Sequence, residues 1–188
     1  GQIRKYVSRQ IDWRVVLRSF VGKLVRGERT NSIKRINKKY PYIHPGVKRG
    51  YQAKLLIAVD QSGSVGDSDL ALFFSELATL TRKISVTILP FDHTVDEANM
   101  KEWKKGQPFN FERTRCGGTD FDAPTNFVND QKNRGKWDGL LILTDGECSK
   151  PGESRLRRAW VIAQNRKLLF DTDEMVIQLS NEPPKSEG

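Results

Sequence analysis

Two apolar runs, each ending on an aspartate, constrain the fold of this 188-residue chain more than any other feature. The first runs from Lys54 to Asp60 and the second from Trp137 to Asp145. A short, continuous apolar run is typical of a strand buried on both faces, as in the parallel sheet of an α/β protein. The two runs therefore predict two central strands, each with a carboxylate at its C-terminal end.

Helical and strand patterns alternate around these two runs. The spacing of apolar residues predicts helices at 11–21, 67–82 and 123–131, further strands at 84–91, 158–163 and 174–179, and a short edge hairpin near 93–97. This alternation predicts a doubly wound, mostly parallel Rossmann-like sheet. We expect three regions, namely a basic helix with an irregular connector over 1–50, the α/β domain over 51–182 and a flexible tail over 183–188.

The net charge of +9 is unevenly distributed. Residues 1–50 contain 14 Lys and Arg against 2 Asp and Glu, a net charge of +12, whereas the remainder is at −3. Residues 27–49 are dense in Lys, Arg, Asn and Pro and are predicted to be irregular. Such an arm can bind phosphate groups or an acidic surface of a partner. Alternatively, it is solvated and packs its few apolar residues on the domain.

The low cysteine content and the lack of long apolar runs suggest the cellular compartment of this chain. It contains two cysteines, Cys116 and Cys148, too few for a disulfide framework, and we expect both to be free thiols in a reducing environment. No stretch approaches the roughly 18 consecutive apolar residues of a membrane span, and the first residues lack the apolar centre of a secretory signal. We therefore expect a soluble, cytoplasmic protein without a membrane partner.

Oxygen-bearing side chains gather at the predicted strand ends. Ligands of open α/β sheets bind outside the carboxyl ends of the strands. The candidate ligands there are Asp60, Ser62, Ser64, Thr119 and Asp145. An all-oxygen set of two carboxylates and three hydroxyls suits Mg²⁺, with Mn²⁺ and Ca²⁺ as alternatives. Two carboxylates at most cancel the charge of such an ion, so a carboxylate from a partner can replace a water in its shell.

The same residues resemble a known site. Asp60-x-Ser62-x-Ser64, then Thr119 after two glycines, then Thr144-Asp145-Gly146 resembles the metal-ion-dependent adhesion site (MIDAS) of the von Willebrand factor A (VWA) family. The resemblance implies that Asp60, Ser62, Ser64, Thr119 and Asp145 bind the ion directly or through water. Gln61 stands where Thr or Leu is more usual, a position that points away from the ion.

The whole chain is similar to bacterial and phage VWA-like proteins in which this domain follows a zinc metallopeptidase domain. No His-Glu-x-x-His occurs here, so we expect no peptidase activity and no catalytic residue. The resemblance implies a module that binds an acidic residue of a protein partner, with a MoxR-type AAA+ ATPase or its substrate as that partner. Two alternatives stay open: nucleic-acid binding by the basic arm, which carries Tyr40, Tyr42 and His44, and, ranked lower, a metal-dependent hydrolase.

Three further acidic residues lie near the predicted site. Asp92 and Asp120 are near enough to support the ligands, although a helix cap is an equal alternative for Asp120. Glu147 is favoured as an ordinary loop carboxylate rather than a ligand. The glycines of the motif loops, Gly146 among them, are expected to provide positive φ angles or close backbone approach.

Overall fold

The computed structural model describes residues 12–39, 52–62, 65–104 and 118–182, with only the backbone described over 28–39. The helices are α1 (Trp13–Lys39), α2 (Asp67–Leu80) and α3 (Asp122–Asn129), with short 3-10 turns at Glu97–Asn99 and Gln131–Asn133. The strands are β1 (Ala53–Asp60), β2 (Ile84–Phe91), β3 (Lys101–Trp103), β4 (Gly139–Thr144), β5 (Arg157–Ile162) and β6 (Met175–Gln178).

The six strands form one sheet in the order β3-β2-β1-β4-β5-β6. Every pairing is parallel except that of β3, which runs antiparallel to β2 at one edge. The predicted doubly wound, mostly parallel sheet is therefore confirmed. The strands predicted from apolar runs all form, and the two internal helices begin within one residue of their predicted starts.

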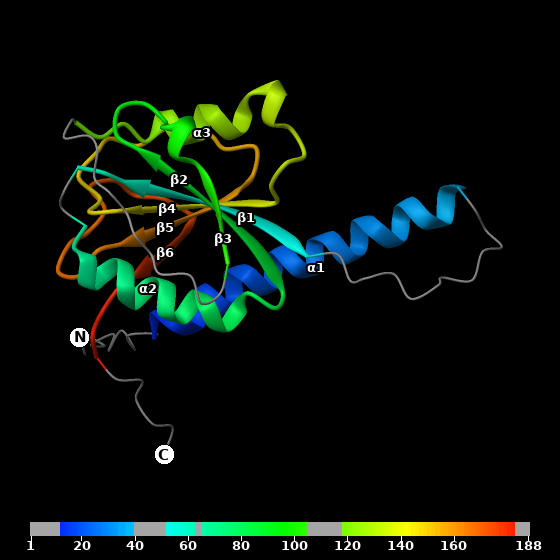
Figure 1. Ribbon diagram of the computed structural model, residues 1–188, viewed down its shortest axis with the longest axis horizontal. Coiled ribbons are helices and arrows are strands. Elements are labelled where there is room, and N and C mark those ends of the chain that lie inside the picture. Colours follow the sequence, from blue (N-terminus) through cyan, green and yellow to red (C-terminus); the bar gives the residue numbers. More distant parts are fainter. Residues whose placement is uncertain (1–11, 40–51, 63–64, 105–117, 183–188) are drawn as a thin grey trace, which may run out of the picture.

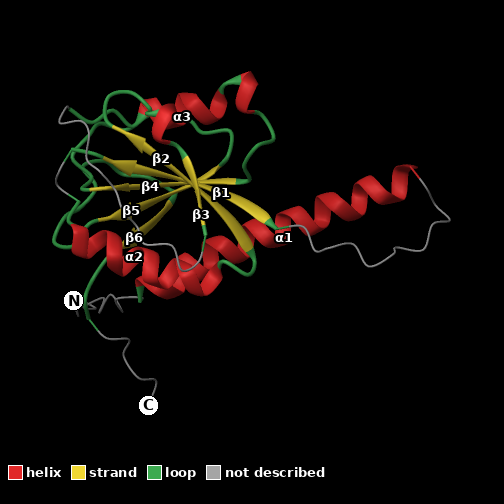
Figure 2. Ribbon diagram, in the orientation of Figure 1, coloured by secondary structure: helices red, strands yellow, loops and turns green. Residues whose placement is uncertain are grey.

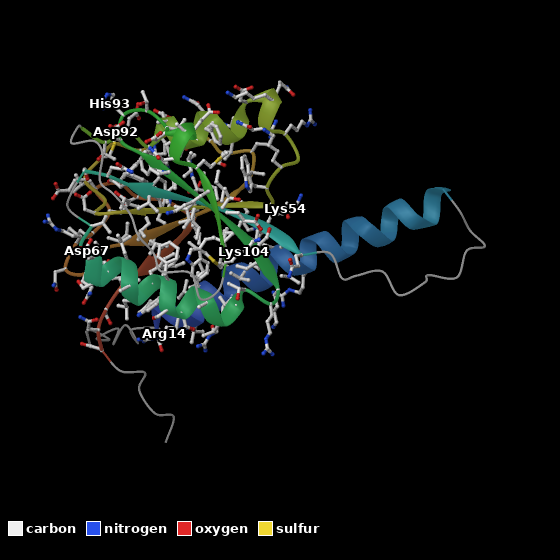
Figure 3. All side chains as sticks on the ribbon, viewed as in Figure 1. Arg14, Lys54, Asp67, Asp92, His93 and Lys104 are labelled. Atoms are coloured by element: carbon white, nitrogen blue, oxygen red, sulfur yellow. The ribbon has the colours of Figure 1, made fainter. Side chains whose placement is uncertain are left out.

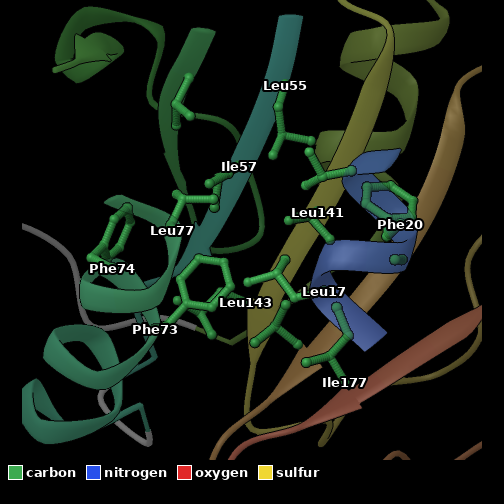
Figure 4. Close-up of a cluster of buried hydrophobic side chains, with 14 of the residues drawn as sticks. Leu17, Phe20, Leu55, Ile57, Phe73, Phe74, Leu77, Leu141, Leu143 and Ile177 are labelled. Carbon is green, nitrogen blue, oxygen red and sulfur yellow. The ribbon is translucent and has the colours of Figure 1, made fainter. Parts of the chain in front are cut away.

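Helices cover both faces of the sheet (Figures 1 and 2). On the face covered by α1 and α2, strand residues such as Ile57 and Leu143 pack against Leu17 and Phe73 (Figure 4). On the opposite face, neighbouring strand residues pack beneath α3 and the following loops in a second cluster that contains Phe121. Because successive residues of β1 and β4 are buried on opposite faces, both strands have the continuous apolar sequence from which they were predicted.

Helix α1 is longer than its sequence pattern suggests. The predicted end near residue 21 and the irregular connector over 27–39 are wrong, since the helix continues through Gly22 and Gly27 to Lys39. A glycine inside a helix costs only about 0.5–1 kcal/mol relative to alanine, which the burial of Phe20 and Leu24 on the sheet offsets. Residues 40–49 of the predicted connector lie outside the described residues.

The first half of α1 substitutes for helices that the β4–β6 region lacks. The connections over 145–156 and 163–174 form no helix, so another element must cover these strands. Trp13 Nε1 donates a hydrogen bond of 3.2 Å to the carbonyl of Ser180, beyond β6. A Cβ at Gly139, the first residue of β4, would lie 2.7 Å from Leu24 Cδ1. Helix α1 therefore crosses this part of the sheet at van der Waals distance. No helix among the described residues is both long and apolar enough to cross a membrane.

The edge beyond β2 departs in detail from the predicted hairpin near 93–97. Phe91 forms an isolated antiparallel bridge with Val95, and the edge strand proper is β3. Trp103 of β3 is buried, with its ring centroid 5.4 Å from that of Phe74. Strand β3, through Trp103, thus covers this edge of the sheet.

The packing of α1 leads to a prediction about stability. We expect Leu17→Ala to lower the free energy of unfolding by about 2–5 kcal/mol, because it leaves a cavity between α1 and the sheet. Val15→Ala is the matched control on the same helix, since Val15 is 52% exposed whereas Leu17 is 0% exposed, and its effect should stay within about 0.5 kcal/mol. Urea unfolding measures both. Equal effects of the two substitutions would show that α1 is not part of the core.

Candidate metal centre

The centre lies where β1 and β4 run side by side. Val59 is in register with Leu143, which places Asp60 next to Thr144 and one residue from Asp145. The chain leaves β1 through α2 on one face, whereas it enters β4 from α3 on the other (Figure 1). Two neighbouring strands whose helices lie on opposite faces form the crevice in which ligands of such sheets bind. The pairing of β1 with β4 thus brings Asp60 and Asp145 to neighbouring strand ends.

Three groups from three separate segments of the chain donate hydrogen bonds to Asp60. The Thr144 hydroxyl donates to Oδ2 at 2.7 Å, and the backbone N–H of Ser62 donates to Oδ1 at 2.9 Å. The hydroxyl of Thr119 lies 3.1 and 3.2 Å from the two carboxylate oxygens and shares its proton between them. Asp60 is only 4% exposed, so these contacts are largely shielded from solvent.

Burial has the largest effect on the charge state of Asp60. It raises the pKa of Asp60 above the ordinary aspartate value, and the negative charge of Asp145 adds to the increase. Hydrogen bonds from Ser62 and Thr144 favour the ionised form but only partly offset the loss of hydration. The ionised Asp60 is therefore costly in the folded protein, and a bound cation is the kind of group that would offset that cost.

The Ser62 hydroxyl gives the clearest test of whether the residues fit an ion. Its oxygen is buried and has no hydrogen-bond partner among the described residues. It lies close enough to Asp60 to act as a side-chain contact that lowers the pKa of that carboxyl, although the two groups are not in hydrogen-bond geometry. A buried hydroxyl without a partner costs about 1–3 kcal/mol. An oxygen-seeking cation beside Asp60 would provide that partner, so the residues present fit such an ion.

Asp145 completes the described part of the centre. It is 3% exposed, and its Oδ1 accepts hydrogen bonds from the Glu147 N–H at 2.9 Å and from the Thr144 hydroxyl at 3.4 Å. The Thr144 hydroxyl thus contacts both carboxylates, and its shorter hydrogen bond is to Asp60. Among the described residues, no group of three or more His, Cys, Asp and Glu side chains is placed to hold a metal. The acidic ligands that this part of the chain could offer an ion at this centre are the carboxylates of Asp60 and Asp145, with hydroxyls beside them.

The loop that contains Thr119 is tied to its neighbours by two contacts. The thiol of Cys148 donates to the Thr119 carbonyl at 3.2 Å, and the Asp120 N–H donates to the Asp92 carbonyl at 3.0 Å. These contacts link the loops that follow β2 and β4 and bring the Thr119 hydroxyl to Asp60. Cys148 is a free thiol, as expected.

Gly146 is required where the loop leaves β4. Its φ of +84° lies in the left-handed region, and a Cβ would be 2.6 Å from the carbonyl oxygen of Lys167. The glycine therefore allows the loop after Asp145 to contact the loop after β5, where the Leu169 N–H donates to the Gly146 carbonyl. Gly146 therefore has both the positive φ angle and the close backbone approach expected of the motif glycines.

The three other acidic residues use their carboxylates elsewhere. Asp92 accepts from the Thr94 N–H at 2.9 Å, which shapes the turn after β2. Asp120 accepts from the Asp122 N–H at 2.9 Å, in the turn before α3, whose N-cap position is Phe121. Glu147 is exposed and pairs with Arg166 at 2.8 Å, as expected of an ordinary loop carboxylate. Figure 3 shows Asp92 and Asp67 on one side of the sheet and Lys54 on the opposite side, where β1 begins.

The structure brings together four of the five predicted ligands, Asp60, Ser62, Thr119 and Asp145, whereas Ser64 lies outside the described residues, as do Cys116 and Gly117. The sequence pattern missed the role of Thr144. A threonine at the end of a buried strand is common, and only the register between β1 and β4 shows that its hydroxyl reaches Asp60.

Comparison with known proteins places these observations in a family. Residues 55–170, more than half of the chain, match the profile of the VWA-like domain family (DUF2201). The chain belongs to this family. The matched region of the VWA-like domain runs from β1 through the loop after β5, and it includes every described residue of the candidate centre.

Two similar proteins extend the comparison. An uncharacterized protein from Thermotoga maritima is 26% identical over 170 residues, which cover 88% of this chain and 41% of that protein. The VWA-like chain thus spans less than half the length of that relative. Among solved structures, an aerotolerance-related membrane protein from Bacteroides fragilis, carrying multiple mutations to serines, is similar with a TM-score of 0.42 and 16% identity, over 58% of this chain and 67% of that one.

The raised pKa of Asp60 predicts an unusual effect of substitution. In chelator, we expect Asp60→Asn to increase the free energy of unfolding at neutral pH by on the order of 1 kcal/mol. The ionised carboxylate costs free energy only in the folded state. That cost is absent at low pH, where Asp60 is protonated in both states, and it develops as pH rises through the ordinary carboxyl range. The advantage of the asparagine should therefore grow with pH.

Thermal and urea unfolding from acidic to neutral pH measure this effect. Glu147→Gln is the control, because its exposed carboxylate loses little hydration on folding, and it should show no such trend. A destabilised Asp60→Asn protein at neutral pH would contradict the expectation.

Proposed function

We propose that this VWA-like domain is a metal-ion-dependent binding module rather than an enzyme. The observation that carries the proposal is the arrangement around Asp60, where the Thr119 hydroxyl, the unpartnered Ser62 hydroxyl and the Asp145 carboxylate come together at one strand end. Asp60, Ser62, Thr119 and Asp145 would hold the ion directly or through water. By resemblance to the adhesion site of the VWA family, Ser64 would join them.

Mg²⁺ is the ion that this donor set suits best. It prefers oxygen ligands, keeps several waters and needs few direct contacts with protein. Mn²⁺ and Ca²⁺ accept the same type of ligand. The two carboxylates would match the charge of one divalent ion and leave no excess negative charge. A carboxylate from a partner could then replace a water without strong repulsion, which favours recognition of an acidic residue.

Binding is favoured over catalysis by the groups that contact Asp60. They are the hydroxyls of Thr119 and Thr144 and the N–H of Ser62, none of which accepts a proton from water at neutral pH. His93 is 63% exposed and lies 3.6 Å from Asp92 on the turn after β2. A metal-dependent hydrolase therefore ranks below a binding module.

The partner proposed for this centre is a protein that presents a carboxylate. The resemblance to bacterial and phage VWA-like proteins, which are often encoded beside MoxR-type AAA+ ATPases, makes such an ATPase or its substrate the first candidate. This would place the chain in the cytoplasm as an adaptor.

Metal binding is the direct test. We expect Mg²⁺ to raise the melting temperature of the wild type and Mn²⁺ to give a bound signal in electron paramagnetic resonance. Asp60→Ala should abolish both effects, because it removes a charged ligand. Thr119→Ala should weaken binding about tenfold, roughly 1.4 kcal/mol. Glu147→Gln, two residues from Asp145 but exposed and paired with Arg166, should bind like the wild type. Equal stabilisation of wild type and Asp60→Ala by Mg²⁺ would rule out this site.

Partner binding can be tested separately with a purified MoxR-type ATPase. We expect capture of the ATPase by the wild-type chain in Mg²⁺, loss of capture in chelator and loss with Asp60→Ala, because the ion bridges the two proteins. Glu147→Gln is again the control. Capture that persists both in chelator and with Asp60→Ala would show that the ion does not mediate the contact.

A further inference from the structure

The two halves of α1 have different surroundings. The first half is fixed to the domain by buried Leu17, Phe20 and Leu24, and Arg18 forms an ion pair with Glu76 of α2. Leu24 is the last buried residue of the helix among those whose side chains are described. In Figure 1 the helix then continues as a rod that extends away from the sheet and from α2. A Cβ at Gly27 would meet no atom within 4 Å.

The rod is strongly basic. Residues 26–39 contain six Lys and Arg and one acidic residue, Glu28, a net charge of +5. At 3.6 residues per turn, positions 26, 29, 34, 35, 38 and 39 are spread around most of the helix circumference rather than along one stripe. The same segment contains Thr30, Asn31, Ser32 and Asn37, which have side chains able to hydrogen-bond to phosphates and bases.

We propose that residues 26–39 of α1 bind double-stranded DNA by lying in its major groove. The groove is about 12 Å wide and admits an α-helix, with phosphates along both sides. A helix of this length spans about 20 Å. Its basic positions, spread around the axis, match a ligand that has phosphates on both sides of the helix. An acidic protein surface would touch one side only and would be matched by a single basic stripe.

The buried first half of α1 gives the rod a fixed direction before binding. Because the helix is continuous from Trp13 to Lys39, the packing of Leu17, Phe20 and Leu24 holds the amino-terminal end of the basic segment. Prior fixing of this end reduces the conformational entropy lost on binding. Base-independent contacts to phosphate are expected to dominate, so affinity should depend steeply on salt.

Fluorescence anisotropy with a labelled duplex of about 20 base pairs, two turns of B-DNA, tests the proposal. The test variant replaces Lys34, Arg35, Lys38 and Lys39 with Gln. The matched control replaces four exposed basic residues of the body, Lys83, Arg134, Lys150 and Arg157, with Gln. Both variants lose four charges, so a difference between them reports position rather than net charge. We expect the helix variant to lose at least about tenfold in affinity and the control to lose much less.

The dependence on salt gives an independent readout. Each phosphate contact contributes about −0.9 to the slope of log affinity against log salt. The helix variant should therefore have a shallower slope by roughly 2–4, with circular dichroism confirming that the variant is folded. Equal losses in the helix and body variants would overturn the proposal. So would polyglutamate competing as well as unlabelled DNA, or tighter binding to duplex RNA, whose major groove is too narrow for a helix.

This test is independent of the metal centre. Chelator and Asp60→Ala should leave DNA affinity unchanged, because the centre is at the carboxyl ends of the strands whereas the rod leaves the domain past the amino end of β4. Loss of DNA binding with Asp60→Ala in a folded protein would overturn the assignment to the helix.

Discussion

The parallel pairing of β1 with β4 is the contact on which the rest of the structure depends. It brings two strands together whose connecting helices lie on opposite faces, so it creates the crevice and places Asp60 beside Thr144 and Asp145. The same pairing puts β1 and β4 at the middle of the sheet, where both of their faces must be covered. A shift of one residue between these strands would separate the Asp60 carboxylate from the hydroxyl of Thr144 and expose apolar side chains.

Helix α1 belongs to the core because the central strands must be covered on both faces. Sequence patterns predicted the strands well, because burial on both faces leaves a continuous apolar run that is visible locally. They failed for α1, since Gly22 is a local stop signal whereas the helix is held by Leu24 packed on Gly139, over one hundred residues away. Likewise, the spacing of Asp60, Thr119 and Asp145 indicates one cluster, but nothing near Thr144 in the sequence shows that its hydroxyl joins two carboxylates.

Burying two neighbouring carboxylates at the centre costs folding free energy. Asp60 and Asp145 are both nearly buried and close enough for the charge of Asp145 to raise the pKa of Asp60. Two neutral residues of similar size would stabilise the metal-free fold more. Such a pair is reasonable where a positive ion neutralises it, because the unfavourable electrostatics then become binding free energy for the ion. The unpartnered Ser62 hydroxyl leads to the same interpretation, since its missing contact is of the kind that an ion provides.

The direction of α1 separates the two proposed binding surfaces. The helix begins near Ser180, beyond the carboxyl end of β6, and passes Gly139 at the amino end of β4 before it extends away from the domain. It therefore runs antiparallel to the strands that it covers and leaves the sheet at the end opposite to Asp60. A partner at the centre and a duplex on the helix would not compete for the same surface. Because the core of one domain holds both, a single chain could position a protein partner relative to DNA.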